Sequence, residues 1–148
     1  MAGTTPVLVH NTSSASCDLT ALKDYANQER TPPPGVRRTS VVTQITQQTP
    51  SGLYVVMAKS QPRTLLDVPN DMEIFVLDRK IHLGCGEIGC LARMIEDGVD
   101  PTGATSTSLF VRGPDSKDAG LHGSVIDPCG RCKATLDHLG VDWTSADG

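Results

Sequence analysis

Two short cysteine-containing motifs hold the residues of this 148-residue chain that could do chemistry. The first is Cys85-Gly86-Glu87, and the second is Pro128-Cys129-Gly130-Arg131-Cys132. Three thiolates can hold one Zn²⁺ ion at about 2.3 Å and leave its fourth position to water, which separates a catalytic zinc from a structural one. We therefore predict one zinc ion per chain, bound by Cys85, Cys129 and Cys132.

Glu87 follows the first cysteine by two positions, so we expect it beside the metal and not among its ligands. There it can take a proton from the attacking water and return it to the leaving group, as a general acid and base. Each motif is expected at the start of a helix, where the helix dipole and unpaired amides stabilise thiolates. Glu87 is thus the predicted catalytic residue.

In these residues the chain resembles the zinc nucleobase deaminases, whose signature is a His or Cys, one residue, a Glu and later Pro-Cys-x-x-Cys. The first ligand is Cys here, as in the free-cytidine deaminases. Over roughly its last two thirds the chain looks most like the deaminase domains at the C-termini of bacterial polymorphic toxins, the YwqJ-like group in particular. The resemblance implies an α/β, cytidine-deaminase-like three-layer fold: a central mixed sheet of about five strands, helices on its faces, and a zinc site at the N-termini of two helices.

The same resemblance implies hydrolytic deamination of cytosine to uracil in nucleic acid. Single-stranded DNA is favoured because an unpaired base avoids the cost of unstacking. RNA bases and free cytidine or nucleotides stay open as substrates, since the net charge of −4 gives no bulk attraction for nucleic acid. Also implied are secretion as part of a larger toxin, action in the target-cell cytoplasm and a cognate immunity protein. We expect a monomer.

A second class of function is a binding module whose zinc is structural and in which Glu87 is only a first-turn residue favoured by the helix dipole. The site would join two helix starts that lie more than forty residues apart, whereas small structural sites usually staple local loops. A metal assay cannot separate the two classes, but ammonia release can. The four ligands of the structural alternative would be His82, Cys85, Cys129 and Cys132.

Six residues in or near the motifs are predicted to contact the substrate. Trp143 could stack on a base, although a lone Trp near a C-terminus also suits packing. The basic pairs Arg37-Arg38, Arg79-Lys80 and Arg131 with Lys133 could contact phosphates or form a solvated surface. The six predicted substrate contacts are Gly86, His82, Asp127, Pro128, Arg131 and Trp143.

Hydrophobic periodicity predicts the elements that position the motifs. One helix is expected from about Leu19 to Glu29 with Asp18 as its cap, and two more begin at the motifs and end near Asp97-Gly98 and Gly140. The expected strands are Ser40–Gln47 and Gly52–Lys59, which read as a hairpin, together with Glu73–Asp78, Thr105–Arg112, Ser124–Asp127 and Val141–Thr144.

The chain divides into three predicted segments. Residues 1–11 resemble the end of a Hint (intein-like) autoprocessing domain, in which a terminal His10-Asn11 pair promotes cleavage of the chain, although an ordinary strand and turn is the alternative. Residues 12–35 form a linker and the N-terminal helix, and residues 36–148 form the zinc-dependent deaminase domain. The longest apolar runs span only a few residues, so we expect no signal peptide and no membrane span.

Two of the five cysteines fall outside the predicted site. Cys90 lies well round the helix from Cys85 and is expected to be a buried free thiol. Cys17 sits in a Ser/Thr-rich stretch and has no assigned role. An odd number of cysteines, three of them ligands, suggests a protein that works in a reducing compartment.

Overall fold

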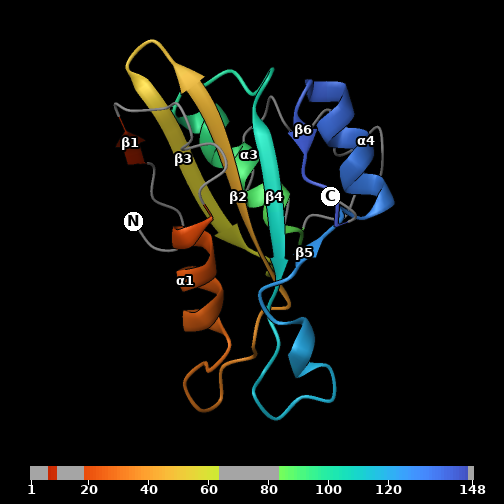
Figure 1. Cartoon of the computed structure of the whole chain (residues 1–148). Helices are drawn as coiled ribbons and strands as arrows, with labels where there is room; N and C mark the ends of the chain where they lie inside the picture. Colours follow the sequence, from red (N-terminus) through yellow and green to blue (C-terminus); the bar gives the residue numbers. More distant parts are fainter. Residues whose placement is uncertain (1–6, 10–18, 64–83, 147–148) are drawn as a thin grey trace.

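The computed structural model describes residues 7–9, 19–63 and 84–146, which form an α/β fold (Figure 1). Helices and strands alternate after an N-terminal helix and a hairpin. In chain order the elements are β1 (Val7–Val9), α1 (Thr20–Glu29), β2 (Val41–Thr49), β3 (Gly52–Lys59), α3 (Gly86–Glu96), β4 (Thr105–Phe110), the 3₁₀ helix η3 (Ala119–Leu121), β5 (Val125–Ile126), α4 (Gly130–Leu139) and β6 (Asp142–Trp143).

The described strands form one mixed sheet in the order β1-β3-β2-β4-β5. Each of these neighbours pairs antiparallel. Strand β6 pairs parallel with β4 through Thr105 and Ser106, whereas β5 pairs with β4 further along, at Ser108 and Leu109. The α/β class and the mixed sheet predicted from the sequence are therefore confirmed.

Strands β2 and β3 form the predicted hairpin, closed by the two residues Pro50 and Ser51 between the paired Thr49 and Gly52. Gly52 adopts a φ of 127°, which few other residues reach. The Thr49 hydroxyl donates to the Gly52 carbonyl at 2.7 Å and accepts the Ser51 N–H at 3.2 Å. Because Thr49 both pairs and closes the turn, β2 runs two residues beyond the predicted end at Gln47.

Helices cover both faces of the sheet, with α1 on one and α3 on the other (Figure 1). On the α1 face, Leu22 and Ala26 pack against Val42, Leu109 and Val111. Leu136 of α4 belongs to the same apolar cluster as the buried side of α3, so α4 lies on the α3 face. That larger cluster contains Ile45, Tyr54, Val56, Ala58, Ile88, Cys90, Leu91, Ala92, Met94, Ala104, Leu136 and Val141.

Both motif helices begin and end where the sequence predicts. Helix α3 has Cys85 as its N-cap and Asp97 as its C-cap, and α4 has Cys129 as its N-cap and ends at Gly140 in the left-handed conformation, with a φ of 75°. The N-terminal helix α1 starts one residue later than expected, because its N-cap is Leu19, whose side chain makes no capping hydrogen bond.

Some predictions fall on residues outside the described ranges: the cap Asp18, the strand Glu73–Asp78, the pair His10-Asn11, Arg79-Lys80 and Cys17. The short strand β1 pairs with the β3 edge through Val7–Val9. The domain boundary after residue 11 stays a prediction. Within the described ranges, no helix has the length and apolar character needed to cross a lipid bilayer.

Candidate metal centre and its cavity

Three cysteine sulfurs meet where α3 and α4 begin. Cys85 and Cys129 are the N-caps of the two helices, and Cys132 lies in the first turn of α4 with its side chain fully buried. The three Sγ atoms lie within 4.8 Å of one another, and all three cysteines are free thiols. The sequence therefore predicted correctly that these cysteines cluster.

The spacing of the cluster suits a metal ion such as zinc. Two thiolates on a tetrahedral zinc with bonds of 2.3 Å stand about 3.8 Å apart. The Sγ atoms of Cys85 and Cys129 are 3.9 Å apart. Cys129 is exposed and Cys85 is half-buried, so the open side of the cluster faces solvent and the cavity described below. The donor set fits one ion and leaves an approach for a further ligand.

Electrostatics within the cluster favour ionisation of Cys85. Its pKa is lowered chiefly by a hydrogen bond from the Cys132 thiol and further by the Arg63 cation. The same bond and burial raise the pKa of Cys132. A divalent cation bound by the cluster would stabilise the thiolate forms of these cysteines.

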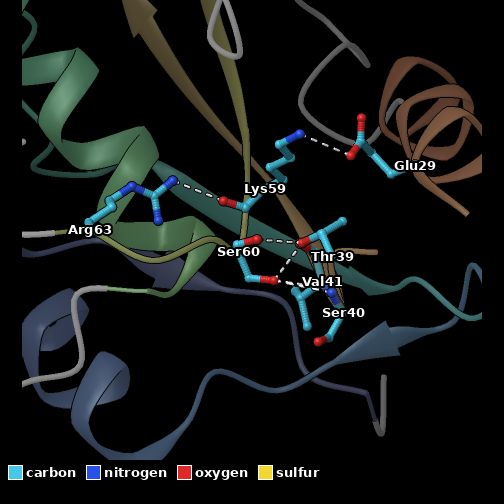
Figure 2. Close-up of polar contacts among 7 residues, drawn as sticks. All are labelled: Glu29, Thr39, Ser40, Val41, Lys59, Ser60 and Arg63. Atoms are coloured by element: carbon cyan, nitrogen blue, oxygen red, sulfur yellow. Dashed lines mark hydrogen bonds and ion pairs between the residues drawn. The ribbon is translucent and has the colours of Figure 1, made fainter. Parts of the chain in front are cut away.

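Arg63 supports the metal centre from outside the motifs. Its Nη1 donates to the Cys85 carbonyl at 3.1 Å, and its Nη2 donates to the Lys59 carbonyl at 2.9 Å. Figure 2 shows the second of these bonds, which ties Arg63 to the end of β3. Sequence reasoning missed this residue because no motif links an arginine to a cysteine carbonyl 22 positions later.

Glu87 is the second residue of α3, and only 4% of its surface is exposed. The Ser108 hydroxyl of β4 donates to its Oε2 at a long 3.4 Å, and the Thr43 hydroxyl of β2 lies 2.7 Å from Ser108 Oγ. Burial is the main cause that raises the pKa of Glu87, since a charged carboxylate loses its hydration there. The raised pKa makes this carboxyl group a stronger base than an exposed glutamate, which suits it to accept and return a proton. Ser108 and Thr43 were also missed by sequence reasoning.

Gly86 lies between the ligand and the carboxylate and packs tightly on the sheet. A Cβ at this position would stand 2.5 Å from Thr43 Oγ1 and 3.1 Å from the Ala58 carbonyl oxygen. Glycine is thus what allows the start of α3 to lie against β2 and β3 at this depth. The same close approach brings Glu87 to Ser108.

A cavity of about 340 Å³ opens beside the cluster. Both N-cap cysteines and Glu87 line it, and so do the predicted substrate contacts Gly86, Asp127 and Pro128. Asp127 is held in place because its Oδ1 accepts the Ala146 N–H at 2.7 Å. The full lining is Ser40, Val41, Ser60, Gly84, Cys85, Gly86, Glu87, Ser108, Ile126, Asp127, Pro128 and Cys129.

The other predicted contacts lie elsewhere. Arg131 is exposed and lines a neighbouring hollow with Cys85, Cys129 and Gly130. Trp143 lies on β6, where it packs against the apolar cluster, and the Lys133 ammonium stands 4.8 Å from its ring centroid. It does not belong to the lining of the cavity. His82 falls outside the described residues.

Cys90 is the buried free thiol that the sequence predicts. It is fully buried, and its Sγ donates to the Thr43 carbonyl at 3.4 Å. Burial raises the pKa of Cys90, so this thiol stays protonated and takes no part in the cluster.

Comparisons of the chain with protein-family models, with curated proteins and with solved structures found no match. The family resemblance therefore rests on the motif residues themselves.

Proposed function

We propose that the chain is a zinc-dependent hydrolytic deaminase that converts cytosine to uracil in nucleic acid, with single-stranded DNA as the favoured substrate. One observation carries the proposal: the buried carboxyl group of Glu87 lines the same cavity as two cysteines of a three-thiol cluster. A structural zinc site needs no proton carrier beside it. A hydrolytic one does.

In the proposed reaction, the three cysteines hold the metal and Glu87 transfers protons. A zinc ion held by Cys85, Cys129 and Cys132 would supply Lewis acidity that makes water a nucleophile near neutral pH. Glu87 takes one proton from the attacking water and delivers it to the ring nitrogen, and a second proton goes to the departing amine. Cytosine and water thus become uracil and ammonia.

The cavity suits a planar, uncharged base. Its volume of about 340 Å³ is at the small end of ligand pockets. Its polar side chains include Ser40, Ser60, Ser108, Glu87 and Asp127, of which Ser40 and Asp127 could meet the edge of a base, and Ile126 and Pro128 supply apolar contact. A base can enter only after leaving its stack, which costs least in a single strand.

The order of elements supports a cytidine-deaminase-like fold. After the β2–β3 hairpin come α3, β4, η3, β5, α4 and β6, with β4 antiparallel to β2 and β6 parallel to β4. Each of the two helices that cross between strands starts at the cysteine cluster. By the same resemblance we propose delivery as the end of a larger secreted toxin, action in the target-cell cytoplasm, and a cognate immunity protein.

The decisive experiment measures ammonia and uracil formed from a cytosine-containing single-stranded oligonucleotide by the zinc-loaded protein. Glu87→Gln should lower turnover by a factor of about 10²–10⁴, which is the usual contribution of a positioned acid–base group. It should keep its zinc, since Glu87 is no ligand. Glu96→Gln is the matched control, because Glu96 is the exposed last residue of the same helix.

Equal turnover by Glu87→Gln and Glu96→Gln would remove Glu87 from the mechanism. Release of zinc by Glu87→Gln would make it a ligand instead. If the parent protein binds zinc but releases no ammonia from DNA, RNA or free cytidine, the centre is a structural one in a binding module.

A further inference from the structure

A basic groove lies next to the cavity and is larger, with a volume of about 900 Å³. Its walls come from the segment before β2, the end of β3 and the residues that follow it, and the first turn of α4. Figure 2 shows the part of the wall built by Thr39, Ser40, Lys59, Ser60 and Arg63. The whole lining is Val36, Arg37, Arg38, Thr39, Ser40, Lys59, Ser60, Gln61, Pro62, Arg63, Gly84 and Arg131.

The charge of this groove is opposite to that of the chain. Five basic side chains line it and no acidic one does, in the part of the protein that the structure describes, although the chain as a whole carries a net charge of −4. The adjoining cavity shows the reverse, because the described residues that line it include two carboxyl groups and no basic side chain. An anion is therefore favoured in the groove and disfavoured in the cavity.

Two of the five basic side chains are held by contacts within the protein. The Lys59 ammonium pairs with Glu29 at 3.2 Å, and Arg63 donates to the Lys59 and Cys85 carbonyls. The other three, Arg37, Arg38 and Arg131, have exposed side chains. Arg38 Nη2 lies 3.5 Å from Ser116 Oγ. These three arginines present their charge to whatever enters the groove.

Groove and cavity share one short stretch of wall, formed by Ser40, Ser60 and Gly84. Hydrogen bonds fix this stretch: the Thr39 hydroxyl donates to the Ser60 carbonyl at 2.6 Å, and Ser60 Oγ accepts the Val41 N–H at 3.2 Å (Figure 2). A ligand can thus extend from the groove into the cavity over a preformed edge. Arg131 lines the groove and also the hollow beside Cys85 and Cys129.

We propose that the basic groove binds the phosphodiester backbone of single-stranded DNA, with Arg37, Arg38 and Arg131 as its phosphate contacts, while the target base occupies the cavity. This rests on the proposed function and names how its substrate is held. The described lining of the cavity has no basic side chain, which suits a neutral base. The described lining of the groove has no carboxylate, which suits a chain of phosphates. A free nucleoside has no phosphate to place in the groove, so the polymer is the substrate that uses both hollows.

Binding of a fluorescein-labelled single-stranded DNA to the zinc-loaded full chain tests the groove apart from catalysis. Glu87→Gln is the parent for this experiment, so that bound DNA is not consumed. The logarithm of affinity should fall linearly with the logarithm of salt concentration, and each arginine removed should lower that slope by about 0.7. Arg37→Gln/Arg38→Gln together should lower it by about 1.4, and Arg131→Gln by about 0.7.

Lys23→Gln is the matched control, since Lys23 is an exposed cation on α1 that does not line the groove. It should leave affinity and slope unchanged. Thermal melts establish that each variant is folded, and two separate arginine variants keep the test valid if one of them is not. The effect should be equal for two unrelated DNA sequences, because phosphates carry no sequence information.

The groove assignment would be overturned if both arginine variants kept the parent's slope of log affinity against log salt concentration. It would also be overturned if Lys23→Gln lowered that slope as much as the arginine variants do. Arginine-dependent binding of RNA but not of DNA of the same sequence would overturn the choice of DNA. If DNA binds through the arginines but is never deaminated, the groove stands and the proposed function falls. If free cytidine is deaminated while DNA does not bind, the deaminase chemistry stands, whereas the DNA substrate and the groove assignment both fall.

Discussion

Replacement of Gly86 by alanine tests how closely α3 packs on the sheet at the metal centre. The added Cβ would stand 2.5 Å from Thr43 Oγ1, 3.0 Å from Thr43 Cβ and 3.1 Å from the Ala58 carbonyl oxygen. Thr43 is fully buried and bonded to Ser108, and Ala58 contributes backbone, so neither neighbour can yield freely. Overpacking of this kind costs about 1–3 kcal/mol of unfolding free energy.

Gly130→Ala is the matched control for this change. Gly130 is the first residue of α4, as Gly86 is of α3, and no heavy atom outside its own helix lies within 4 Å of a Cβ built there. Alanine is favoured over glycine in helices by up to about 1 kcal/mol, so Gly130→Ala should leave stability unchanged or raise it. The two substitutions are identical in chemistry and differ only in the space around them.

Urea unfolding of the two zinc-loaded variants measures the difference. Gly86→Ala should unfold at a lower urea concentration than Gly130→Ala, by a free energy of at least about 1 kcal/mol. It should also lose turnover, because displacement of Thr43 disturbs the Ser108 hydroxyl that contacts Glu87. Equal urea midpoints for the two variants would refute the packing argument, and with it the explanation for a glycine between ligand and carboxylate.

X-ray absorption of the zinc-loaded protein should show three sulfur ligands and one oxygen, and four sulfurs or an imidazole nitrogen would contradict the site. Cys132→Ser should lose zinc, whereas Cys90→Ala should keep it. His122 Nδ1 accepts the Arg112 backbone N–H at 3.1 Å, and burial lowers the pKa of His122. The contribution of neutral His122 to the unfolding free energy is therefore full above the unfolded-state pKa of about 6.5 and is lost as the pH falls below it. Urea unfolding at pH 7 and pH 5 should show a smaller loss in His122→Ala than in the parent, and equal losses would reject this linkage. When the upstream region is included in expression, the chain should be cleaved after Asn11; an intact junction by mass spectrometry would reject autoprocessing.

The two helix starts could be predicted because their signals are local. A cysteine at each N-cap is followed by apolar residues at helical spacing, and Gly140 supplies a left-handed stop. Residues that cap helices at a shared edge of a sheet come together once the strands between them pair. The cysteine cluster therefore followed from the motif spacing together with the α/β order, and it is confirmed.

The support around the cluster could not be predicted, because it depends on contacts between distant segments. Arg63 reaches the Cys85 carbonyl from the residues after β3, and no periodicity marks an arginine for that role. Ser108 belongs to a strand of sequence Thr-Ser-Thr-Ser-Leu-Phe, and nothing in that sequence marks one hydroxyl group as a partner of Glu87. The structure buries Ser106, Thr107 and Ser108, since β4 lies inside the sheet with neighbours on both edges.

Trp143 shows how a residue type can suggest a role that position does not supply. A lone tryptophan close in sequence to a nucleobase-type motif suggests stacking on a base. In the structure its ring packs on the apolar cluster and accepts the Lys133 cation over its face, away from the cavity lining. The lining of the cavity instead carries serine hydroxyl groups and Asp127.

The polarity of the sheet face under α3 explains how a buried carboxyl group can exist in this fold. A carboxylate without partners is costly to bury, and Glu87 has a long hydrogen bond from Ser108 and one from its own backbone N–H. Beneath the first turn of α3 the sheet offers the hydroxyl groups of Thr43 and Ser108, whereas further along the helix Leu91 and Met94 join an apolar cluster with Ile45 and Val56. The later turns of α3 therefore stabilise the fold by apolar burial, and that stability offsets the cost of an ionisable group at its start. The dipole of α3 is positive at the same end. It therefore makes the charged form of Glu87 less costly here than it would be further along the helix, at the end where the cysteines and the cavity also lie.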